Sequence, residues 1–413
     1  MKTTEPVCVL GMNPGSLDIP DNCSHLLENA TLLAGGSRLL DAVGREVAPD
    51  ADRLPLSSPL DRCVRRIRKE MDGGGRAVVL ADGDPLFFGI GNLLSRELGR
   101  ERLKVLPAVS TLQLAASRLG VSWERTVSIS LHGRSDYTPL FAALVRADTI
   151  AIFTDEENDP SAVARAMLER GADGFTMTVL ERLGTEGEQV RRVGLEDTWG
   201  MGFDPLNLVF LEREYPPEVP LRLGVPDHFY FHQRGLITKL PVRATGLALL
   251  AIAPGATVWD LGSGCGSVAI EASHLAVDGR VVAVERDRTR AAMIRENQRR
   301  MGAWLVEVVT GGLPGCLKRL PDPDRVFIGG GLGGESNKES DLLEAVAERL
   351  RPGGRLVAHC ILLDTLHRTQ AFFKERGWLF GVTQLQANEA DQLAGDLRFR
   401  AANPVFILWA EKP

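Results

Sequence analysis

The chain has 413 residues, of which 44% are hydrophobic and 25% are charged, and its formal net charge at pH 7 is −6. This length allows two or three domains, and the composition is that of a soluble globular protein. The negative charge gives no general attraction to nucleic acid, so we expect no nucleic-acid partner.

The six cysteines are scattered and form no CxxC pair, which predicts neither a disulfide framework nor a zinc cluster and favours a reducing compartment. A strand-like run, Val7–Gly11, follows the first residues at once and leaves no room for a signal peptide. No apolar run approaches the ~20 residues that a membrane helix needs. We therefore expect a cytoplasmic protein with no membrane partner.

Short apolar runs alternate with helical stretches throughout the N-terminal half. Val7–Leu10 is one such run, and Arg76–Leu80 is another, soon followed by Gly83-Asp84-Pro85. This alternation predicts an α/β domain with ligands at the carboxyl ends of its strands. Gly83 would let the backbone approach a ligand closely, and Pro85 would fix the turn behind it. Turns also use these residues for shape alone.

Two later loops in this half carry polar residues. Ser110 and Thr111 open a helical stretch, so the first interpretation is an N-cap and the second is a polar loop facing a ligand. The strand-like run Val127–Leu131 ends in His132 and Arg134, on either side of a glycine. This pair suits an anionic substrate, and a solvated turn explains it equally well.

These segments together resemble the tetrapyrrole methylase family, in particular its branch that methylates C5 of precorrin-6Y. The matching segments are VLGMNPG (Val9–Gly15), LADGDPLFFGIG (Leu80–Gly91), PAVSTLQLAASRLGVSW (Pro107–Trp123), SLHGR (Ser130–Arg134) and NLVFLER (Asn207–Arg213). In that family S-adenosylmethionine lies in a cleft between two α/β subdomains, gripped by the backbone of two loops. The resemblance implies that the cofactor contacts are Gly83, Asp84, Pro85, Ser110 and Thr111.

A segment rich in proline and charge, Glu212–Pro226, separates the two halves. Such a segment disfavours helix and central strand and behaves as a semi-rigid spacer. We therefore predict an N-terminal domain over residues 1–213, a linker over 214–226 and a C-terminal domain over 227–413.

The C-terminal domain begins with an aromatic and polar stretch, Asp227–Gly235. His228 and His232 are spaced i, i+4 and could share a helix face, but a metal site needs at least a third ligand and none is nearby. We therefore predict no metal site. An aromatic arm that folds over a substrate cavity is the favoured interpretation.

The stretch VWDLGSGCGSVAIE (Val258–Glu271) is the most informative in this domain. A strand ending at Asp260, a glycine-rich turn and a helix bring main chain close to a nucleotide-like ligand. The turn carries the alternate glycines Gly262, Gly264 and Gly266. The next apolar run ends in Glu285, whose carboxylate can accept hydrogen bonds from a ribose diol.

The ligand of this turn is expected to lack phosphates. Cys265 stands between the glycines, and the first basic residue after it is Arg280, so the loop offers no cation to a pyrophosphate. An adenosine derivative such as S-adenosylmethionine fits. Gly311 follows the third strand, where the adenine is expected.

Five strand–helix units followed by a terminal pair of strands predict the seven-strand sheet of a methyltransferase. A nicotinamide dehydrogenase would continue with further strand–helix units instead. The expected fold class is therefore α/β: an N-terminal two-subdomain tetrapyrrole methylase fold, followed by a Rossmann-like seven-strand S-adenosylmethionine methyltransferase domain.

This second half resembles the enzymes that methylate C15 of precorrin and decarboxylate it, through GLITK with Arg243, DLGSGCGSVAIEA and VFIGGG. In this order the two halves resemble the fused precorrin-6Y C5,15-methyltransferases of cobalamin biosynthesis. The resemblance implies methylation of precorrin-6Y (precorrin-6B) at C5 and C15 and decarboxylation of a ring acetate, giving precorrin-8X. It also implies one S-adenosylmethionine site per domain and a homo-oligomer. The cobalt-containing counterpart of the substrate remains an alternative.

Methyl transfer from a sulfonium is an in-line displacement, to which orientation contributes on the order of 7–11 kcal/mol, and no strong general base is obligatory. The many carboxylates of the substrate favour Lys239, Arg243 and Arg134 as anchors. Lys239, Arg243 and His132 form the predicted catalytic set. An RNA or protein methyltransferase leaves the N-terminal half unexplained, and a non-catalytic sensor of adenosyl ligands is the other alternative.

Overall fold

A computed structural model describes residues 5–19, 23–57, 59–233, 235–329, 332 and 336–413. The chain divides into two compact units. The first unit spans residues 1–133, 149–161 and 176–212, and the second spans 134–148, 162–175 and 213–413. The predicted limits of the domains and of the linker stay a prediction.

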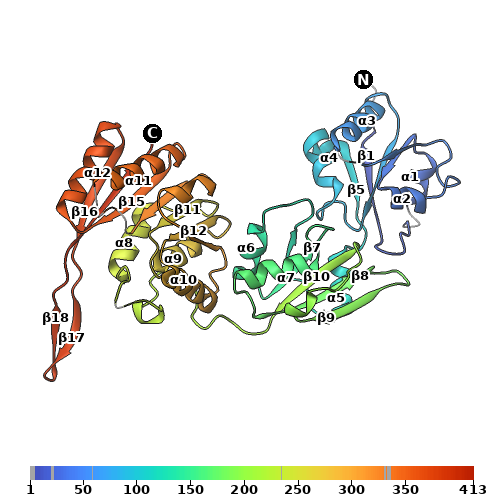
Figure 1. Cartoon of the computed structure of the whole chain (residues 1–413). Helices are drawn as coiled ribbons and strands as arrows, with labels where there is room; N and C mark the ends of the chain where they lie inside the picture. Colours follow the sequence, from blue (N-terminus) through green and yellow to red (C-terminus); the bar gives the residue numbers. More distant parts are fainter. Residues whose placement is uncertain (1–4, 20–22, 58, 234, 330–331, 333–335) are drawn as a thin grey trace. The chain divides into compact units, whose positions relative to one another are not determined.

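A five-stranded parallel sheet begins the first unit, in the order β3-β2-β4-β1-β5. Figure 1 labels its strands β1 and β5. Its strands are β1 (Val7–Met12), β2 (Leu32–Gly35), β3 (Asp52–Pro55), β4 (Ala77–Asp82) and β5 (Leu103–Leu106). The connecting helices are α1 (Ser24–Glu28), α2 (Ser37–Ala42), α3 (Asp61–Asp72), α4 (Ile90–Leu98) and the 3-10 turn η2 (Arg100–Arg102). Leu10 and Val9 of β1 belong to different hydrophobic clusters, since alternate side chains of a strand point to opposite faces. Both faces of this sheet are therefore covered.

The second sheet of the first unit is mixed, in the order β6-β7-β10-β8-β9. Its strands are β6 (Val127–Ser130), β7 (Thr149–Phe153), β8 (Phe175–Glu181), β9 (Gln189–Val193) and β10 (Asn207–Arg213). The helix α5 (Thr111–Leu119) and the 3-10 turn η3 (Glu196–Thr198) belong to the same unit, whereas α6 (Thr138–Arg146) and most of α7 (Pro160–Glu169) belong to the second unit. Leu112 and Ala115 of α5 pack on Ala151, Leu180 and Phe210 of the sheet. The two α/β sheets predicted for this half are confirmed.

A seven-stranded sheet forms the centre of the second unit, in the order β13-β12-β11-β14-β15-β19-β16. The first five strands are parallel, and β19 pairs antiparallel with β15 and with β16. The strands are β11 (Thr257–Leu261), β12 (Arg280–Glu285), β13 (Val306–Thr310), β14 (Arg325–Ile328), β15 (Arg355–Cys360), β16 (Leu379–Leu385) and β19 (Val405–Glu411). The predicted methyltransferase sheet is confirmed.

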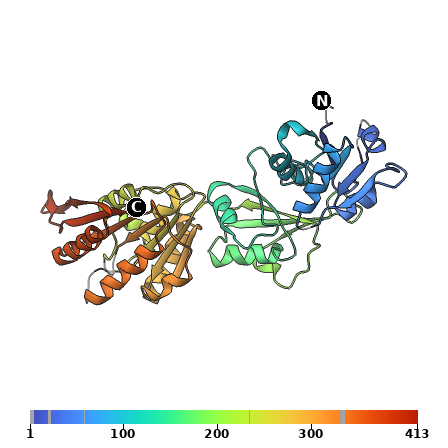
Figure 2. The same cartoon turned by 90° about the horizontal axis from the view of Figure 1, so that it is seen from above.

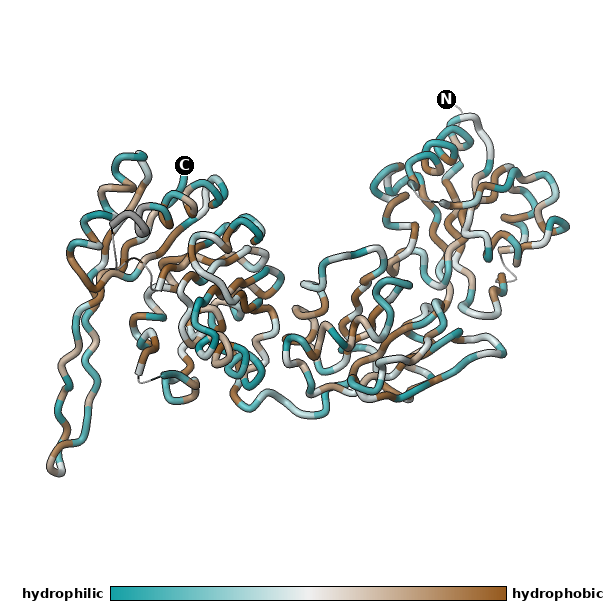
Figure 3. Tube along the Cα trace, in the orientation of Figure 1, coloured by the Kyte–Doolittle hydropathy of each residue, from teal (hydrophilic) through white to brown (hydrophobic). Residues whose placement is uncertain are grey.

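Helices cover both faces of this sheet (Figure 2). One face packs on α8 (Leu240–Leu250), α9 (Ser267–Leu275) and α10 (Arg288–Met301), and the other on α11 (Ser336–Arg349) and α12 (Leu363–Glu375). Two short 3-10 turns, η4 (Asp227–Phe229) and η5 (Gly315–Arg319), complete the unit. Hydrophobic residues gather along the strands and hydrophilic residues on the outer turns of the helices (Figure 3). None of the described helices is long and apolar enough to cross a membrane.

The sequence did not predict a two-stranded hairpin, β17 (Glu389–Leu393) and β18 (Asp396–Arg400), between β16 and β19. It extends away from the sheet to which those strands belong (Figure 1). Its side chains Leu393, Leu397 and Phe399 are all more than half exposed. Gly330 and Gly331, two of the glycines in the predicted VFIGGG turn, lie outside the described residues.

Candidate functional site

A cleft with a volume of about 420 Å³ opens in the first unit, a size typical of small-molecule pockets. All five strands of the parallel sheet bring their carboxyl ends to it, because residues that end or follow each of β1 to β5 line it. Leu180 and Leu208 of the mixed sheet complete the wall. This is the edge of the sheet at which the sequence placed the ligand.

Gly83 stands where three loops meet. Its N–H donates to the carbonyl of Met12 (2.8 Å), and its carbonyl accepts from the N–H of Ala108 (3.3 Å). Its φ is +60°, and a Cβ there would lie 3.0 Å from the carbonyl oxygen of Val109 and 3.1 Å from Cα of Ser110. Only glycine allows this approach, so the Gly83-Asp84-Pro85 turn is a structural requirement of the cleft as well as a candidate contact.

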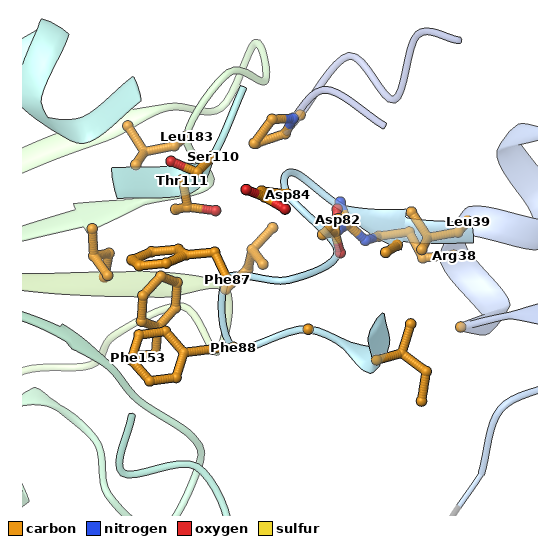
Figure 4. A pocket seen from close by; sticks show the side chains of 18 of the residues that line it. Arg38, Leu39, Asp82, Asp84, Phe87, Phe88, Ser110, Thr111, Phe153 and Leu183 are labelled. Atoms are coloured by element: carbon orange, nitrogen blue, oxygen red, sulfur yellow. The ribbon is translucent and has the colours of Figure 1, made fainter. Parts of the chain in front are cut away.

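The turn after Gly83 places an aromatic cluster in the cleft (Figure 4). Asp84 accepts the N–H of Leu86 (2.8 Å), and the carbonyl of Pro85 accepts the N–H of Gly91 (2.9 Å). Phe88 then adopts a φ of +55°, which side-chain-bearing residues rarely do, and remains 49% exposed. The rings of Phe87, Phe88 and Phe153 lie 5.0 to 5.7 Å apart. Figure 4 shows them grouped along one wall.

Ser110 is the N-cap of α5, as the first interpretation of its motif predicted. Its hydroxyl accepts the N–H of Gln113 (3.2 Å), and its own N–H donates to the side chain of Gln113 (2.9 Å), which completes a capping box. Ser110 and Thr111 also line the cleft. The capping and ligand-facing interpretations of this loop are therefore compatible.

In the second unit the glycine-rich turn connects β11 to α9. Gly262, Gly264 and Gly266 have φ values of +74°, +62° and +84°, the left-handed region that favours glycine. A Cβ at Gly266 would lie 2.7 Å from the side chain of Ile294, whereas one at Gly264 would meet no described atom within 4 Å. Gly266 thus serves helix packing, and Gly264 borders open space.

Two carboxylates hold this turn. Glu285, at the end of β12, accepts the N–H of Gly264 on Oε2 (2.9 Å) and a guanidinium N–H of Arg290 on Oε1 (2.8 Å). Asp260 accepts the Ser263 hydroxyl and the N–H of Ala269 (3.1 Å). Burial raises the pKa of Asp260 to about 6, against the opposing effect of these hydrogen bonds. Each carboxylate oxygen accepts about two hydrogen bonds, so Oε2 of Glu285 retains capacity for a ligand hydroxyl.

Gly311 lies beside this carboxylate, at the end of β13. Its N–H donates to the backbone carbonyl of Glu285 (3.0 Å). The predicted adenine-side and ribose-side residues are therefore adjacent at the carboxyl end of the sheet.

The three residues of the predicted catalytic set have different environments. Arg243 is fully buried and pairs with the buried Glu271 (2.8 Å). Lys239 is about half exposed, and its ammonium lies 3.3 Å from Asp227. His132 is exposed just after β6 and is not among the described residues that line the cleft. His132 belongs to the first unit and the two cations to the second.

The predicted aromatic arm, Asp227–Gly235, is fastened to the glycine-rich turn by residues that the sequence did not identify. Asn297 of α10 accepts the N–H of Phe231 (2.8 Å) and donates to the carbonyl of Cys265 (2.9 Å). Glu271 of α9 accepts the hydroxyl of Tyr230 (3.2 Å). Within the described ranges no group of three or more His, Cys, Asp or Glu residues is arranged to hold a metal ion.

Residues 10–198 match the family of tetrapyrrole (corrin/porphyrin) methylases, and residues 229–412 match the precorrin methyltransferase domain. A precorrin-6Y C(5,15)-methyltransferase (decarboxylating) of Sinorhizobium sp is 35% identical over 359 residues, 85% of this chain and 83% of the relative. The chain belongs to the precorrin-6Y C(5,15)-methyltransferase (decarboxylating) family. The family resemblance of the motifs is thereby confirmed.

Other members of this family are also similar. That of Mycobacterium tuberculosis (strain CDC 1551 / Oshkosh) is 31% identical over 87% of this chain and 88% of its own length. The protein in a crystal structure of precorrin-6y C5,15-methyltransferase from Geobacter metallireducens GS-15 is 35% identical over 46% of this chain and 97% of its own, with a TM-score of 0.43. As a member of a methyltransferase family, the chain uses S-adenosylmethionine as its methyl donor.

Some of the residues that line the cleft of this precorrin-6Y C(5,15)-methyltransferase family member were not predicted from its sequence. Arg38 and Asp82 line it and pair at 2.6 Å. A usable signal was present, because Arg38 follows the glycine pair Gly35-Gly36 at the end of an apolar run, as ligand-binding loops do. Phe88 lay within a quoted motif but was not assigned a role.

Proposed function

We propose that this chain methylates precorrin-6Y at C5 and at C15 and decarboxylates a ring acetate, giving precorrin-8X in cobalamin biosynthesis. The names of its relatives support this reaction. The observation that carries the proposal is that one chain holds two differently built glycine-rich regions, each at the carboxyl ends of parallel strands. Two methylations at distant ring positions account for both.

We propose one S-adenosylmethionine site in each unit. In the first, the cofactor would contact Gly83, Asp84, Pro85, Ser110 and Thr111; the cleft volume supports this, and the Asp84 carboxylate complements a sulfonium charge. In the second, it would contact Asp260, Gly262, Gly264, Gly266, Glu285 and Gly311; the open space at Gly264 and the remaining acceptor capacity of Glu285 support this. The bound cofactor supplies an electrophilic methyl group.

The chain's own contribution to methyl transfer is orientation. The aromatic wall of Phe87, Phe88 and Phe153 offers an apolar surface to the face of a flat ring and excludes water there. Holding a ring carbon in line with the donor contributes on the order of 7–11 kcal/mol to the lowering of the barrier. No general base is required of the residues around the cleft.

In the second unit the predicted catalytic set takes two roles. We propose that Lys239, about half exposed at the start of α8, binds a substrate carboxylate. Arg243 has no exposed surface, so we propose it as a positioning residue that holds Glu271 and the arm. His132 in the first unit and Arg134 in the second each remain a separate proposed contact to a substrate carboxylate.

The remaining expectations are also proposals. A homo-oligomer is supported by the exposed apolar residues Leu393, Leu397 and Phe399 of the hairpin, since an isolated two-stranded hairpin is marginally stable in water. A cytoplasmic location rests on the scattered cysteines. The domain limits 1–213, 214–226 and 227–413 rest on the proline-rich segment. The cobalt-containing substrate is the alternative to the metal-free one.

The test gives the purified chain precorrin-6Y with methyl-labelled S-adenosylmethionine and analyses the product by mass spectrometry. Two methyl groups gained and one carbon dioxide lost are expected, and equilibrium dialysis should find two cofactor molecules per chain. A single methyl group or a single cofactor would contradict the two-site proposal. Parallel assays with the cobalt-loaded ring decide between the two substrates by their kcat/KM.

A further inference from the structure

The N-terminal cleft contains one cation among the described residues that line it, the guanidinium of Arg38. Arg38 lies in the first turn of α2, and one of its terminal nitrogens donates to both oxygens of Asp82, at 2.7 and 2.6 Å. Asp82 is the last residue of β4, directly before Gly83. The pair therefore lies next to the turn that the cofactor is proposed to contact (Figure 4).

Stability does not explain this pair. The side chains of Arg38 and Asp82 are 42% and 44% exposed, and ion pairs that are so accessible to water contribute little to stability. Beside them Gly36 also lines the cleft, and a Cβ there would meet no described atom within 4 Å. Because the Arg38 side chain lines the cleft and is 42% exposed, a ligand in the cleft can reach it.

The cleft otherwise suits an apolar ring. Phe88 exposes 49% of its surface, and its ring lies 5.3 Å from that of Phe153. The other charged groups of the lining are the carboxylates of Asp82 and Asp84, which repel an anion. Among the described residues that line the cleft, a flat macrocycle with carboxylates on its rim therefore finds an aromatic surface on one wall and a single cation, at Arg38.

We propose that Arg38 is a specificity-determining residue that binds a carboxylate side chain of the tetrapyrrole in the N-terminal cleft. Asp82 holds the guanidinium in place until the substrate carboxylate binds. A guanidinium has five N–H donors and can bind a carboxylate with two parallel hydrogen bonds. This contact would orient the ring as well as bind it. This inference rests on the proposed function and names a contact for it.

The two members of the pair should respond in opposite directions. Arg38→Met removes the contact and should raise KM for the tetrapyrrole in C5 methylation by about 10- to 100-fold. Asp82→Asn removes a competitor for the guanidinium and should lower that KM by about two- to fivefold. Arg38→Lys keeps the positive charge but lacks the planar set of guanidinium N–H donors. Its KM for the tetrapyrrole should therefore lie between those of wild type and Arg38→Met. A pair with a purely structural role would affect KM in the same direction in both variants.

Arg76→Met is the matched control. Arg76 forms an exposed ion pair with Glu5 (3.1 Å), whose side chains are 51% and 61% exposed, and it lies in the same unit but does not line the cleft. Its variant should keep the wild-type KM, and KM for S-adenosylmethionine should stay within about twofold in all the variants. Unchanged tetrapyrrole KM in Arg38→Met, or equal effects in Arg38→Met and Arg76→Met, overturns the proposal while the proposed function stands.

A binding measurement separates this inference from the reaction itself. Uroporphyrin, an octacarboxylate ring, is titrated into wild type and Arg38→Met by the quenching of its fluorescence, and its octamethyl ester serves as the uncharged probe. Weaker binding of uroporphyrin alone to Arg38→Met supports the contact even if wild type methylates nothing, in which case the proposed function fails instead. Equal affinity of both proteins for uroporphyrin, or no binding to either, overturns the contact.

Discussion

His359 is a partly buried histidine on β15 whose imidazole packs against Phe327. Its ring meets that of Phe327 edge to face at 4.6 Å, and its Nε2 lies 2.8 Å from the position that a Cβ on Gly246 would occupy. Nε2 is buried and has no hydrogen-bond partner among the described residues. Burial lowers the pKa of His359 from 6.5 to about 4.

The stability of the second unit should therefore depend on His359 in acid. The unfolded chain protonates this group near pH 6.5 and the folded chain only near pH 4, so the folded state loses stability as pH falls through that window. His359→Leu should remove this loss. The unfolding free energy of His359→Leu minus that of wild type should increase by about 2 kcal/mol when the pH is lowered from 7 to 5. Urea titrations at both pH values measure the difference, and parallel curves would contradict it.

Gly264 offers a second test with a matched control. An alanine at Gly264 would have an unfavourable φ of +62°, but its Cβ would have no described atom within 4 Å. The same is true at Gly353, whose φ is +71°. Gly264→Ala and Gly353→Ala should each lose about 1 kcal/mol of stability. Only Gly264→Ala should also weaken S-adenosylmethionine binding to the second unit, because its methyl group occupies the proposed ligand space. Calorimetric titration decides, and equal affinities would exclude a ligand at Gly264.

Helices α8 and α9 hold the aromatic arm through one buried ion pair. Arg243 of α8 donates to Glu271 of α9 (2.8 Å) and to the carbonyl of Val225 (2.6 Å). Glu271 also accepts the backbone N–H groups of Gly224 (2.9 Å) and Val225 (3.0 Å). The pair therefore fixes the segment before the arm as well as the two helices.

Breaking this pair on one side should destabilise the second unit strongly. Glu271→Gln removes the fully buried counter-charge of Arg243 and leaves it only the less buried carboxylate of Asp227 at 3.2 Å, so it should cost about 3–5 kcal/mol of unfolding free energy. Glu296→Gln, which breaks the exposed Arg299–Glu296 pair, should cost at most about 1 kcal/mol. The double variant Arg243→Met/Glu271→Leu should lose less than the sum of its two single changes. Denaturation followed by tryptophan fluorescence measures these differences, and similar losses for Glu271→Gln and Glu296→Gln would contradict the argument.

At the scale of the whole chain, a substitution in one glycine-rich region should impair the methylation carried out by that unit and leave the other methylation intact. Gly83→Ala places a Cβ 3.0 Å from backbone in the first unit, whereas Gly264→Ala affects only the second. With methyl-labelled donor, Gly83→Ala should lose the label at C5 and Gly264→Ala should lose most of the label at C15, each seen by NMR of the product. Loss of both labels from either single change would show that the sites depend on each other.

The sequence by itself predicted the parallel strands and the ligand-facing loops of both units, because their signals are local, but it did not predict the β17–β18 hairpin. Alternating apolar runs predict parallel strands, and glycines directly after a strand predict a turn that approaches a ligand. Gly83 and Gly264 could be found this way, since backbone conformation depends on a few neighbouring residues. The N-cap at Ser110 could also be predicted, because it depends only on the residues at the start of its own helix.

Only the tertiary structure decided which side chains meet. Arg38 and Asp82 are 44 residues apart and come together because β2 and β4 are neighbours in the sheet. Arg243 looks like a substrate anchor in the sequence, yet packing buries it against Glu271, 28 residues away. Charge and periodicity carry no information about such pairings, because the order of strands and the packing of helices determine them.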